Sequence, residues 1–385
     1  MRNIAIIGGG ASGIAAAITA ADAGARVTLF EAGKRIGHSI LVSGNGRCNW
    51  SNSLVNPGDY TNAPFVARAF QACPPQRVWD WFESLGLVSV EESAGRRYPA
   101  ANKASSVLDV LRFRLEELPV QIACECKAAH LRPAGERWAI EFENGRTECF
   151  DAVIVACGGQ VAQELLPPGT RFTPRHPRLC PVRTDHDSVK GLDNIRVKGT
   201  ASLLRGADIV AKERGEIQFR SFGVSGIVVF DLSRHARPGD VIRLDFLPEV
   251  SEIMLVDNLV KRAKRFPKRS AEQLLAGMVL PPVARAVLHR AGLDAADALP
   301  VERTVDVARR MKRYEVQVER FEEKSAQVTQ GGVAVDQVDP ATMAMHDAPG
   351  LFVTGEALDV DGPCGGYNLH WAWTCGLLAG SAVTQ

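Results

Sequence analysis

The chain opens on NIAIIGGGASGIAAAITAADAGARVTLFE, residues 3–31, and this stretch decides the fold. Its apolar and alanine-rich runs predict, in order, a strand at 3–7, a helix at 14–23 and a second strand at 26–30. Gly8, Gly10 and Gly13 give G-x-G-x-x-G between the first strand and the helix, and Glu31 ends the second strand. This order of elements predicts a βαβ unit that binds a dinucleotide.

Each part of the turn has a physical reason. Gly8 allows a tight turn, Gly10 lets the backbone approach a pyrophosphate, and Gly13 lets helix and strand pack closely. The helix N-terminus offers unpaired N–H groups to phosphates, and Glu31 can accept hydrogen bonds from ribose hydroxyls. A βαβ unit with an accidental glycine turn is the alternative. The candidate cofactor contacts in this part are Gly8, Gly10, Ala11, Ser12, Gly13, Glu31, Ala32 and Lys34.

Length and composition limit the other possibilities. A chain of 385 residues suits two or three domains. A net charge of +1 gives no global attraction to nucleic acid or membrane. The nine scattered cysteines contain no CxxC pair, which argues against a disulfide framework and a zinc site, so we expect no metal. The start of the chain leads directly into a strand and no apolar run reaches about 18 residues, so we expect a cytoplasmic protein.

The next segments favour FAD over NAD. Residues 33–52, GKRIGHSILVSGNGRCNWSN, form a Gly/Ser/Asn-rich basic loop that suits a pyrophosphate or the polar edge of an isoalloxazine. Residues 151–156 predict another buried strand, which a glycine turn closes. The candidate contacts here are Ser43, Gly44, Asn45, Arg47, Cys48, Asn49, Cys157, Gly158 and Gly159.

The far end of the chain is the decisive feature. A predicted strand at 350–354 leads into a glycine-rich loop, and Gly365 and Gly366 precede an apolar helix at about 369–378. Such a helix N-terminus brings positive dipole to the N1/O2 edge of a flavin. NAD-only domains have no reason to pair the two ends in this way. The candidate contacts are Gly355, Glu356, Asp361, Gly365, Gly366, Tyr367, Asn368 and Leu369.

Four long motifs carry a resemblance to a known family. They are SGNGRCNWSN (43–52), GRRYPAANKASSVLDVL (95–111), TQGGVAVDQVDPATM (329–343) and GLFVTGEALDVDGPCGGYNLHWAW (350–373). They resemble the YhiN/BaiN-like bacterial flavoproteins, also called the aminoacetone-oxidase family of FAD-binding enzymes. The resemblance implies an α/β fold, a glutathione-reductase-like FAD-binding Rossmann domain interrupted by an insert with a small β-barrel and a helical subdomain. The implied FAD domain spans 1–185 and 326–385, and the insert 186–325 has its barrel at 186–250 and 316–325 and its helical part at 251–315.

The family's activities are diverse. Members are linked to reduction of conjugated C=C bonds in dehydro bile acids, to dihydrouridine formation in ribosomal RNA and to aminoacetone oxidation. The leading hypothesis is an FAD-dependent, NAD(P)H-driven reductase of an activated C=C bond in a small molecule or ribosomal RNA. An oxygen-using amine oxidase and a non-catalytic flavin- or RNA-binding protein are the alternatives. His370, where Gln is more usual, and Cys364, where a small hydroxyl residue is frequent, depart from the family pattern.

The middle of the chain predicts a small antiparallel sheet or barrel followed by helices. The expected strands are 200–210, 215–222, 227–232, 240–246 and 316–321, and the expected helices are 251–265, 271–280, 282–292 and 300–310.

Basic residues gather in this insert. Residues 186–325 hold 25 Lys and Arg against 20 Asp and Glu. KRAKRFPKR (261–269) has six basic residues, and Arg309, Arg310, Lys312 and Arg313 form a second cluster. RFTPRHPR (171–178) is a third run, just before the insert. These runs suit an RNA backbone. A solvated helix face is the alternative, and the few aromatic side chains for base stacking count against RNA.

Only one G-x-G-x-x-G is present, so we expect no second nicotinamide domain. NAD(P)H would then bind transiently in the cleft that the substrate later occupies. Reduction of a C=C bond also needs a proton donor, and the candidates are Cys48, Cys364, Tyr367 and His370. Structural packing is the alternative for each. Arg47 suits stabilisation of negative charge, because a guanidinium stays charged.

Overall fold

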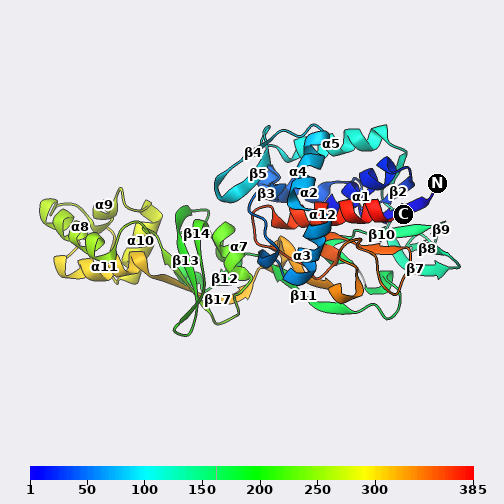
Figure 1. Ribbon diagram of the computed structural model, residues 1–385. Coiled ribbons are helices and arrows are strands. Elements are labelled where there is room, and N and C mark those ends of the chain that lie inside the picture. Colours follow the sequence, from blue (N-terminus) through cyan, green and yellow to red (C-terminus); the bar gives the residue numbers. More distant parts are fainter. Residues whose placement is uncertain (162) are drawn as a thin grey trace. The chain divides into compact units, whose positions relative to one another are not determined.

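The structure is a computed structural model that describes residues 1–161 and 163–385. The chain divides into two compact units, of which unit 1 is Met1–His176 with Val328–Gln385 and unit 2 is Pro177–Gln327. Both ends of the chain thus build unit 1 (Figure 1). In the described residues, no helix has the length and apolar character needed to span a membrane.

A five-stranded parallel sheet forms the centre of unit 1. Its order is β19 (Leu351–Val353), β10 (Ala152–Val155), β1 (Asn3–Ile7), β2 (Arg26–Phe30) and β6 (Val120–Ala123). The first four correspond to the strands expected from the sequence. The carboxyl ends of parallel strands meet at one edge, so the glycine turns that follow β1, β10 and β19 lie together there.

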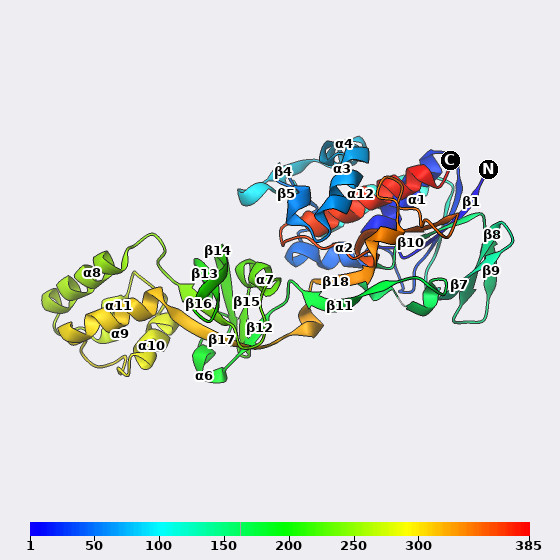
Figure 2. The same ribbon diagram turned by 60° about the horizontal axis from the view of Figure 1, so that its bottom comes forward.

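Helices α1 (Ala11–Asp22) and α12 (Tyr367–Ala382) lie side by side, as Figures 1 and 2 both show. Glycines on α12 allow this close approach. A Cβ on Gly376 would lie 2.5 Å from Ser12 O, and one on Gly380 would lie 2.8 Å from Ala16 O. The last helix of the chain therefore packs directly on the helix of the first glycine turn.

Smaller elements complete unit 1. Its other helices are α2 (His38–Val42), α3 (Ala63–Ala72), α4 (Pro75–Ser84) and α5 (Ala104–Glu117). Two small antiparallel assemblies are β3 (Ser51–Asn52) with β5 (Arg96–Pro99) and β4 (Ser89–Glu91), and β7 (Ala128–Ala134) with β8 (Arg137–Phe142) and β9 (Thr147–Phe150). A two-stranded sheet joins β18 (Val328–Val333) to β11 (Phe172–Arg178), whose last two residues already belong to unit 2.

Unit 2 contains the expected barrel and helices (Figure 2). The closed barrel has the order β12 (Val182–Thr184), β15 (Gly223–Ser225), β14 (Asp208–Arg220), β13 (Arg196–Arg205), β16 (Val241–Asp245) and β17 (Tyr314–Phe321). The helices are α6 (His186–Val189), α7 (Ile227–Ser233), α8 (Glu252–Arg265), α9 (Ala271–Leu275), α10 (Pro281–Arg290) and α11 (Thr304–Lys312). Unit 2 starts before the expected boundary at 185/186 and ends after the one at 325/326. β12 is already a barrel strand, and Arg183 on β12 pairs with Glu322, just after β17.

One expected strand is wrong. Residues 227–232 form helix α7, which buries Val228, Val229 and Leu232. A short apolar run does not distinguish a buried strand from a buried helix. The hairpin turn of β13 and β14 also lies at 206–207 rather than at 211–214.

Candidate flavin-binding site

The first glycine turn has the geometry that its sequence requires. Gly8 has φ of 114°, and a Cβ there would lie 2.3 Å from Ala156 O. A Cβ on Gly13 would lie 1.9 Å from Gly8 O. Gly10 differs, because its nearest neighbour would be Ser39 Oγ at 3.4 Å. The protein itself leaves the space beside Gly10 open, which fits a ligand that approaches the backbone.

The N-terminus of α1 fits an anionic group. Gly10 occupies its N-cap position, and no side chain of the described residues caps it. Ala11 and Ser12, in the first turn, are buried. The N–H groups of this turn and the helix dipole are therefore available to a pyrophosphate.

Glu31 lies beside this turn and is already oriented by the backbone. Its carboxylate accepts hydrogen bonds from Gly9 N at 2.8 Å and from Gly33 N at 2.6 Å. Each carboxylate oxygen has a further lone pair for a ribose hydroxyl. The neighbouring Ala32 and Lys34 are exposed.

The loop after α2 has an unusual backbone. Gly44, Asn45, Gly46 and Cys48 all have positive φ, between 55° and 79°. Ser43 Oγ donates to Ile40 O at 2.7 Å and so anchors the loop to α2. Asparagine tolerates this conformation better than other side chains. The backbone amides of such a segment suit an anion or a flavin edge.

Arg47 is held in place by protein groups. Its guanidinium pairs with Glu92, donates to Asn102 Oδ1 and lies 4.0 Å above the ring of Tyr98. The hydrogen bond to Glu92 raises the pKa of Arg47 further above its ordinary value. Protein groups thus hold Arg47 in place, and the carboxylate of Glu92 already balances its charge.

The C-terminal arm meets the first turn at its other side. Thr354 Oγ1 donates to Ser12 Oγ at 3.3 Å, and a Cβ on Gly355 would lie 2.9 Å from the same oxygen. Glu356 Oε1 accepts from Thr329 N at 2.6 Å, and a Cβ on Gly159 would lie 2.8 Å from it. Burial raises the pKa of Glu356, while hydrogen bonds from Thr329 and Gly159 oppose this. Three chain segments therefore converge on this carboxylate.

The N-terminus of α12 sits directly on the loop of residues 43–52. Gly366, its N-cap, has φ of 100°, and a Cβ there would lie 2.3 Å from Ser51 O. Asn52 Nδ2 donates to Gly365 O at 2.9 Å. Asn49 Oδ1 is buried, lies 2.9 Å from the place of that Cβ, and has no hydrogen-bond partner among the described residues. Asn49 Oδ1 and the N–H groups at the start of α12, which no described side chain caps, could therefore bind the polar edge of a ligand.

His370 is the most constrained of the proton-donor candidates. It is fully buried, and Ser51 Oγ lies 2.9 Å from its Nδ1. Trp79 Nε1 donates to Ser51 Oγ at 2.8 Å, so we assign the hydroxyl proton of Ser51 to His370 Nδ1. Neutral His370 then carries its own proton on Nε2, which has no partner among the described residues. Burial, with the charge of Arg97, lowers the pKa of His370 to about 3.

The other candidates differ in exposure. Cys48 is fully buried, and burial raises its pKa to about 12. Cys157, expected as a cofactor contact and not as a proton donor, donates from Sγ to Ile7 O at 3.4 Å. Cys364 and Tyr367 are half-buried at the start of α12. Of the four, these two present surface beside the helix N-terminus.

The remaining contacts of this arm shape its loop. Asp361 is buried and accepts from Thr61 Oγ1 at 2.5 Å. Asn368 Oδ1 accepts from Gly362 N at 2.8 Å, which closes the turn before α12. Leu369 is half-buried, and Gly158 has φ of 66°.

Sequence reasoning missed several residues that build this region: Gly9, Ser51, Trp79, Arg97 and Thr329. The glycine run 8–10 was a signal for Gly9, since a Cβ there would lie 2.6 Å from Ile36 Cγ2. Ser51 and Arg97 are directly opposite on β3 and β5, a pairing that only the register reveals.

Glycine turns from opposite ends of the chain thus meet at one edge of a parallel sheet, beside two helix N-termini that no described side chain caps. This fold and site define an FAD-binding oxidoreductase of the Rossmann class. The chain belongs to the family described as "HI0933-like protein Rossmann domain", whose family model matches residues 2–382.

Two relatives match almost throughout. The chain is 32% identical over 410 residues to the "3-dehydro-bile acid delta(4,6)-reductase" of Clostridium scindens, with 100% of each chain covered. It is 27% identical over 390 residues to the "Ribosomal RNA dihydrouridine synthase" of Escherichia coli, covering 96% of this chain and 94% of the relative.

Solved structures share the fold. A 3-ketosteroid-delta4-(5alpha)-dehydrogenase from Rhodococcus jostii RHA1 has a TM-score of 0.50 at 14% identity, covering 100% of this chain and 97% of that chain. The quinol fumarate reductase FrdA of E. coli has a TM-score of 0.50 at 17% identity, covering 100% and 70%.

Proposed function

We propose that this protein reduces a C=C bond conjugated to a carbonyl group, with NADH or NADPH as the source of electrons. The full-length match to a relative named as a delta(4,6)-reductase supports this most. Formation of dihydrouridine, in the name of a second relative, is also hydrogenation of a double bond conjugated to a carbonyl. Bound FAD supplies hydride transfer, while the protein supplies position, charge and a proton.

The residues of this chain divide these tasks. The turn at Gly8–Gly13 binds the pyrophosphate, Glu31 binds a ribose, and the N-terminus of α12 stabilises negative charge at the flavin's polar edge. Cys364 and Tyr367 are the proton-donor candidates that we favour, because both are only partly buried. His370 has a pKa of about 3 and is therefore neutral near pH 7. It positions Ser51, and through Ser51 also Trp79, rather than protonating a substrate.

Anaerobic mixing with NADPH or NADH tests the proposal. We expect rapid bleaching of the flavin, followed by reoxidation when a cyclic enone is added. The Tyr367→Phe and Cys364→Ser variants should bleach normally, and loss of the true donor should slow enone reduction by about 10²–10⁴-fold. A flavin that neither nucleotide bleaches would contradict the proposal, and peroxide release with aminoacetone would favour an oxidase.

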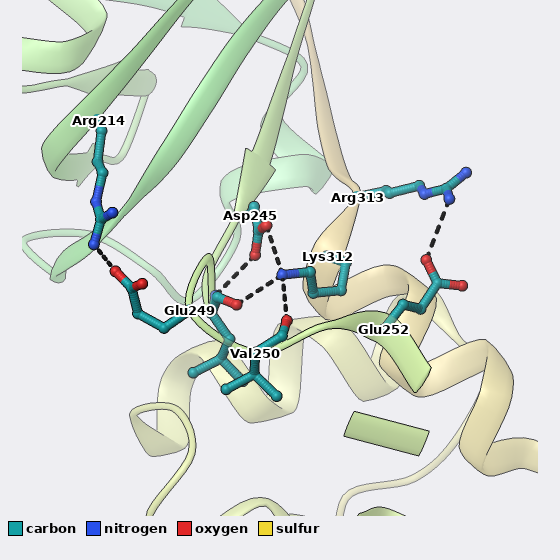
Figure 3. Close-up of polar contacts among 8 residues, drawn as sticks. Arg214, Asp245, Glu249, Val250, Glu252, Lys312 and Arg313 are labelled. Carbon is teal, nitrogen blue, oxygen red and sulfur yellow. Dashed lines mark hydrogen bonds and ion pairs between the residues drawn. The ribbon is translucent and has the colours of Figure 1, made fainter. Parts of the chain in front are cut away.

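RNA is a second candidate substrate, and the charge pattern of unit 2 favours one patch for it. In the cluster on α11, Arg313 pairs with Glu252 at 3.2 Å and Lys312 with Asp245 at 2.7 Å (Figure 3). Arg309 and Arg310 also have acidic partners. The run at 261–269 differs: Lys261 pairs with Asp257 at 2.5 Å, but Lys264 and Lys268 have no acidic partner in the part of the chain that the structure describes.

Mapping of dihydrouridine in a deletion strain tests this version. We expect one ribosomal uridine to stay unmodified without the protein. A Lys264→Gln/Lys268→Gln double variant should have a shallower slope of the logarithm of the RNA-binding constant against the logarithm of salt concentration. The decrease should correspond to the loss of about two phosphate contacts. Lys212→Gln, at an exposed position on β14, is the control. Unchanged ribosomal RNA in the deletion strain would remove RNA as the substrate and leave the small enone.

A further inference from the structure

Unit 2 contains a large cavity between its barrel and its helices. The cavity has a volume of about 1120 Å³ and is lined by residues of unit 2 alone. Its walls are the start of β13 around Val197, Phe246 just after β16, and the α9–α10 connection at 276–281. A volume of this order is enough for a drug-sized molecule.

The walls are mainly apolar. Phe246 is buried at one side, and Met278 and Val279 are half-buried at the other. Leu280 is 46% exposed, although it lines the cavity together with the ring of Pro281. Partly exposed apolar side chains that gather in a concavity are typical of a ligand-binding site.

The wall that carries Phe246 is fixed by a largely buried cation, Lys312. Lys312 Nζ lies 2.7 Å from Asp245 Oδ2, and it donates to the carbonyls of Leu247 and Val250 at 2.7 Å each (Figure 3). Phe246 N donates to Met311 O at 3.1 Å. The residues on both sides of Phe246 are therefore anchored to α11.

The opposite wall is fixed in a similar way. Arg262 Nη1 donates to Leu274 O at 2.9 Å and to Ala276 O at 2.8 Å, which holds the α9–α10 connection against α8. Arg285 pairs with Glu272 at 2.8 Å and links α10 to α9. A cavity whose walls are anchored in advance costs little to order when a ligand binds.

One lining cation is left without an ion pair among the described residues, whereas the lining carboxylate of Asp294 accepts a hydrogen bond from Ala296 N at 2.9 Å. Arg196 pairs with Glu216 at 3.2 Å, and Arg285 with Glu272. Lys198 is exposed, lines the cavity, and has no ion pair among the described residues. A ligand with one negative group satisfies Lys198 while its body covers the apolar walls.

We propose that this cavity binds a small amphipathic anion, a molecule with a rigid apolar body and one carboxylate or sulfonate group. The body packs against Phe246 and the 278–280 segment, and the anionic group lies at Lys198. This binding is separate from the flavin chemistry and does not depend on the proposed reaction.

The probe that tests it is 8-anilinonaphthalene-1-sulfonate, with the uncharged N-phenyl-1-naphthylamine as its neutral counterpart. Calorimetric titration of the full-length holoprotein should show one site for the sulfonate. Lys198→Met should weaken sulfonate binding about tenfold and leave the neutral probe unchanged. Lys212→Met, which removes an exposed lysine outside the cavity lining, should bind both probes like the wild type. Equal sulfonate affinity in wild type and Lys198→Met would overturn the assignment of the anion.

A second variant tests the place of the apolar body. Ala296 is an exposed lining residue, so Ala296→Trp should fill the cavity without disturbing the core. We expect loss of sulfonate binding with unchanged flavin content and circular dichroism. Ala207→Trp, at the exposed turn of β13 and β14, should bind like the wild type. Undiminished binding to Ala296→Trp would show that the dye binds elsewhere and would refute the proposal.

Discussion

The imidazole of His370 is kept neutral by its surroundings. Burial and the charge of Arg97 lower its pKa from 6.5 to about 3. Below pH 6.5 the unfolded chain binds a proton that the folded chain does not, so the folded state loses stability as the pH falls from 6.5 towards 3. We expect this one residue to contribute about 1.4 kcal/mol per pH unit to that loss.

Urea unfolding at pH 7, 6, 5 and 4 measures this effect. His370→Gln removes the titrating group but keeps a side chain that can bond to Ser51. Its free energy of unfolding should fall less steeply with acidification than that of the wild type. Exposed His38→Gln should keep the wild-type slope. Parallel slopes for wild type and His370→Gln would show that His370 is not held neutral.

Among the elements, α12 depends on the conformation of its N-cap residue. Gly366 has φ of 100° and touches Ser51 O, so Gly366→Ala should displace the helix N-terminus and weaken FAD binding at least tenfold. Gly24→Ala is the matched control, since Gly24 has φ of 90° but no atom within 4 Å of an added Cβ. It should cost only about 1–2 kcal/mol for the positive φ and keep its flavin. The ratio of flavin to protein absorbance checks both; equal retention would contradict the close contact.

The contact between α11 and the barrel depends on Lys312, whose side chain is only 12% exposed and bonds to Asp245, Leu247 and Val250. Lys312→Met leaves Asp245 without its cation and two carbonyls without their donor. We expect a loss of about 2–3 kcal/mol in the free energy of unfolding, measured with urea. Lys261→Met, which breaks the exposed ion pair with Asp257, should cost about 0.5 kcal/mol or less. Similar losses for the two variants would show that the contacts of Lys312 stabilise the fold no more than an exposed ion pair does.

For the whole molecule, the division into two units predicts that each folds alone. The ends of unit 2 lie together, because Gln327 N donates to Leu179 O at 3.2 Å and Glu322 N to Pro181 O at 2.9 Å. We expect the fragment 177–327 to unfold cooperatively in urea. A chain with 177–327 replaced by a short Gly/Ser linker should still bind FAD. Loss of flavin from that chain would show that unit 1 needs the insert.

The sequence alone predicted the parts of the flavin domain that depend on local chemistry. A buried strand, a turn that only glycine allows and a helix N-terminus follow one another within 3–31, so neighbouring residues specify them. The pairing of both chain ends followed from the same signals at 350–366. The apolar run at 227–232 lacked such a signal, because its length and composition suit either a strand or a helix until its packing on β14 is known.

The tertiary structure decided the partners of charged and polar side chains. The positive charge of the basic cluster at 309–313 is largely balanced by ion pairs with Glu252, Asp306 and Asp245. These carboxylates come from another turn of α11 or from other elements. Arg97 and Ser51 meet His370 only because β3, β5 and α12 pack together. Ion pairs and buried hydrogen bonds join residues far apart in sequence, so their existence depends on register and packing, whereas a glycine turn depends only on its own backbone.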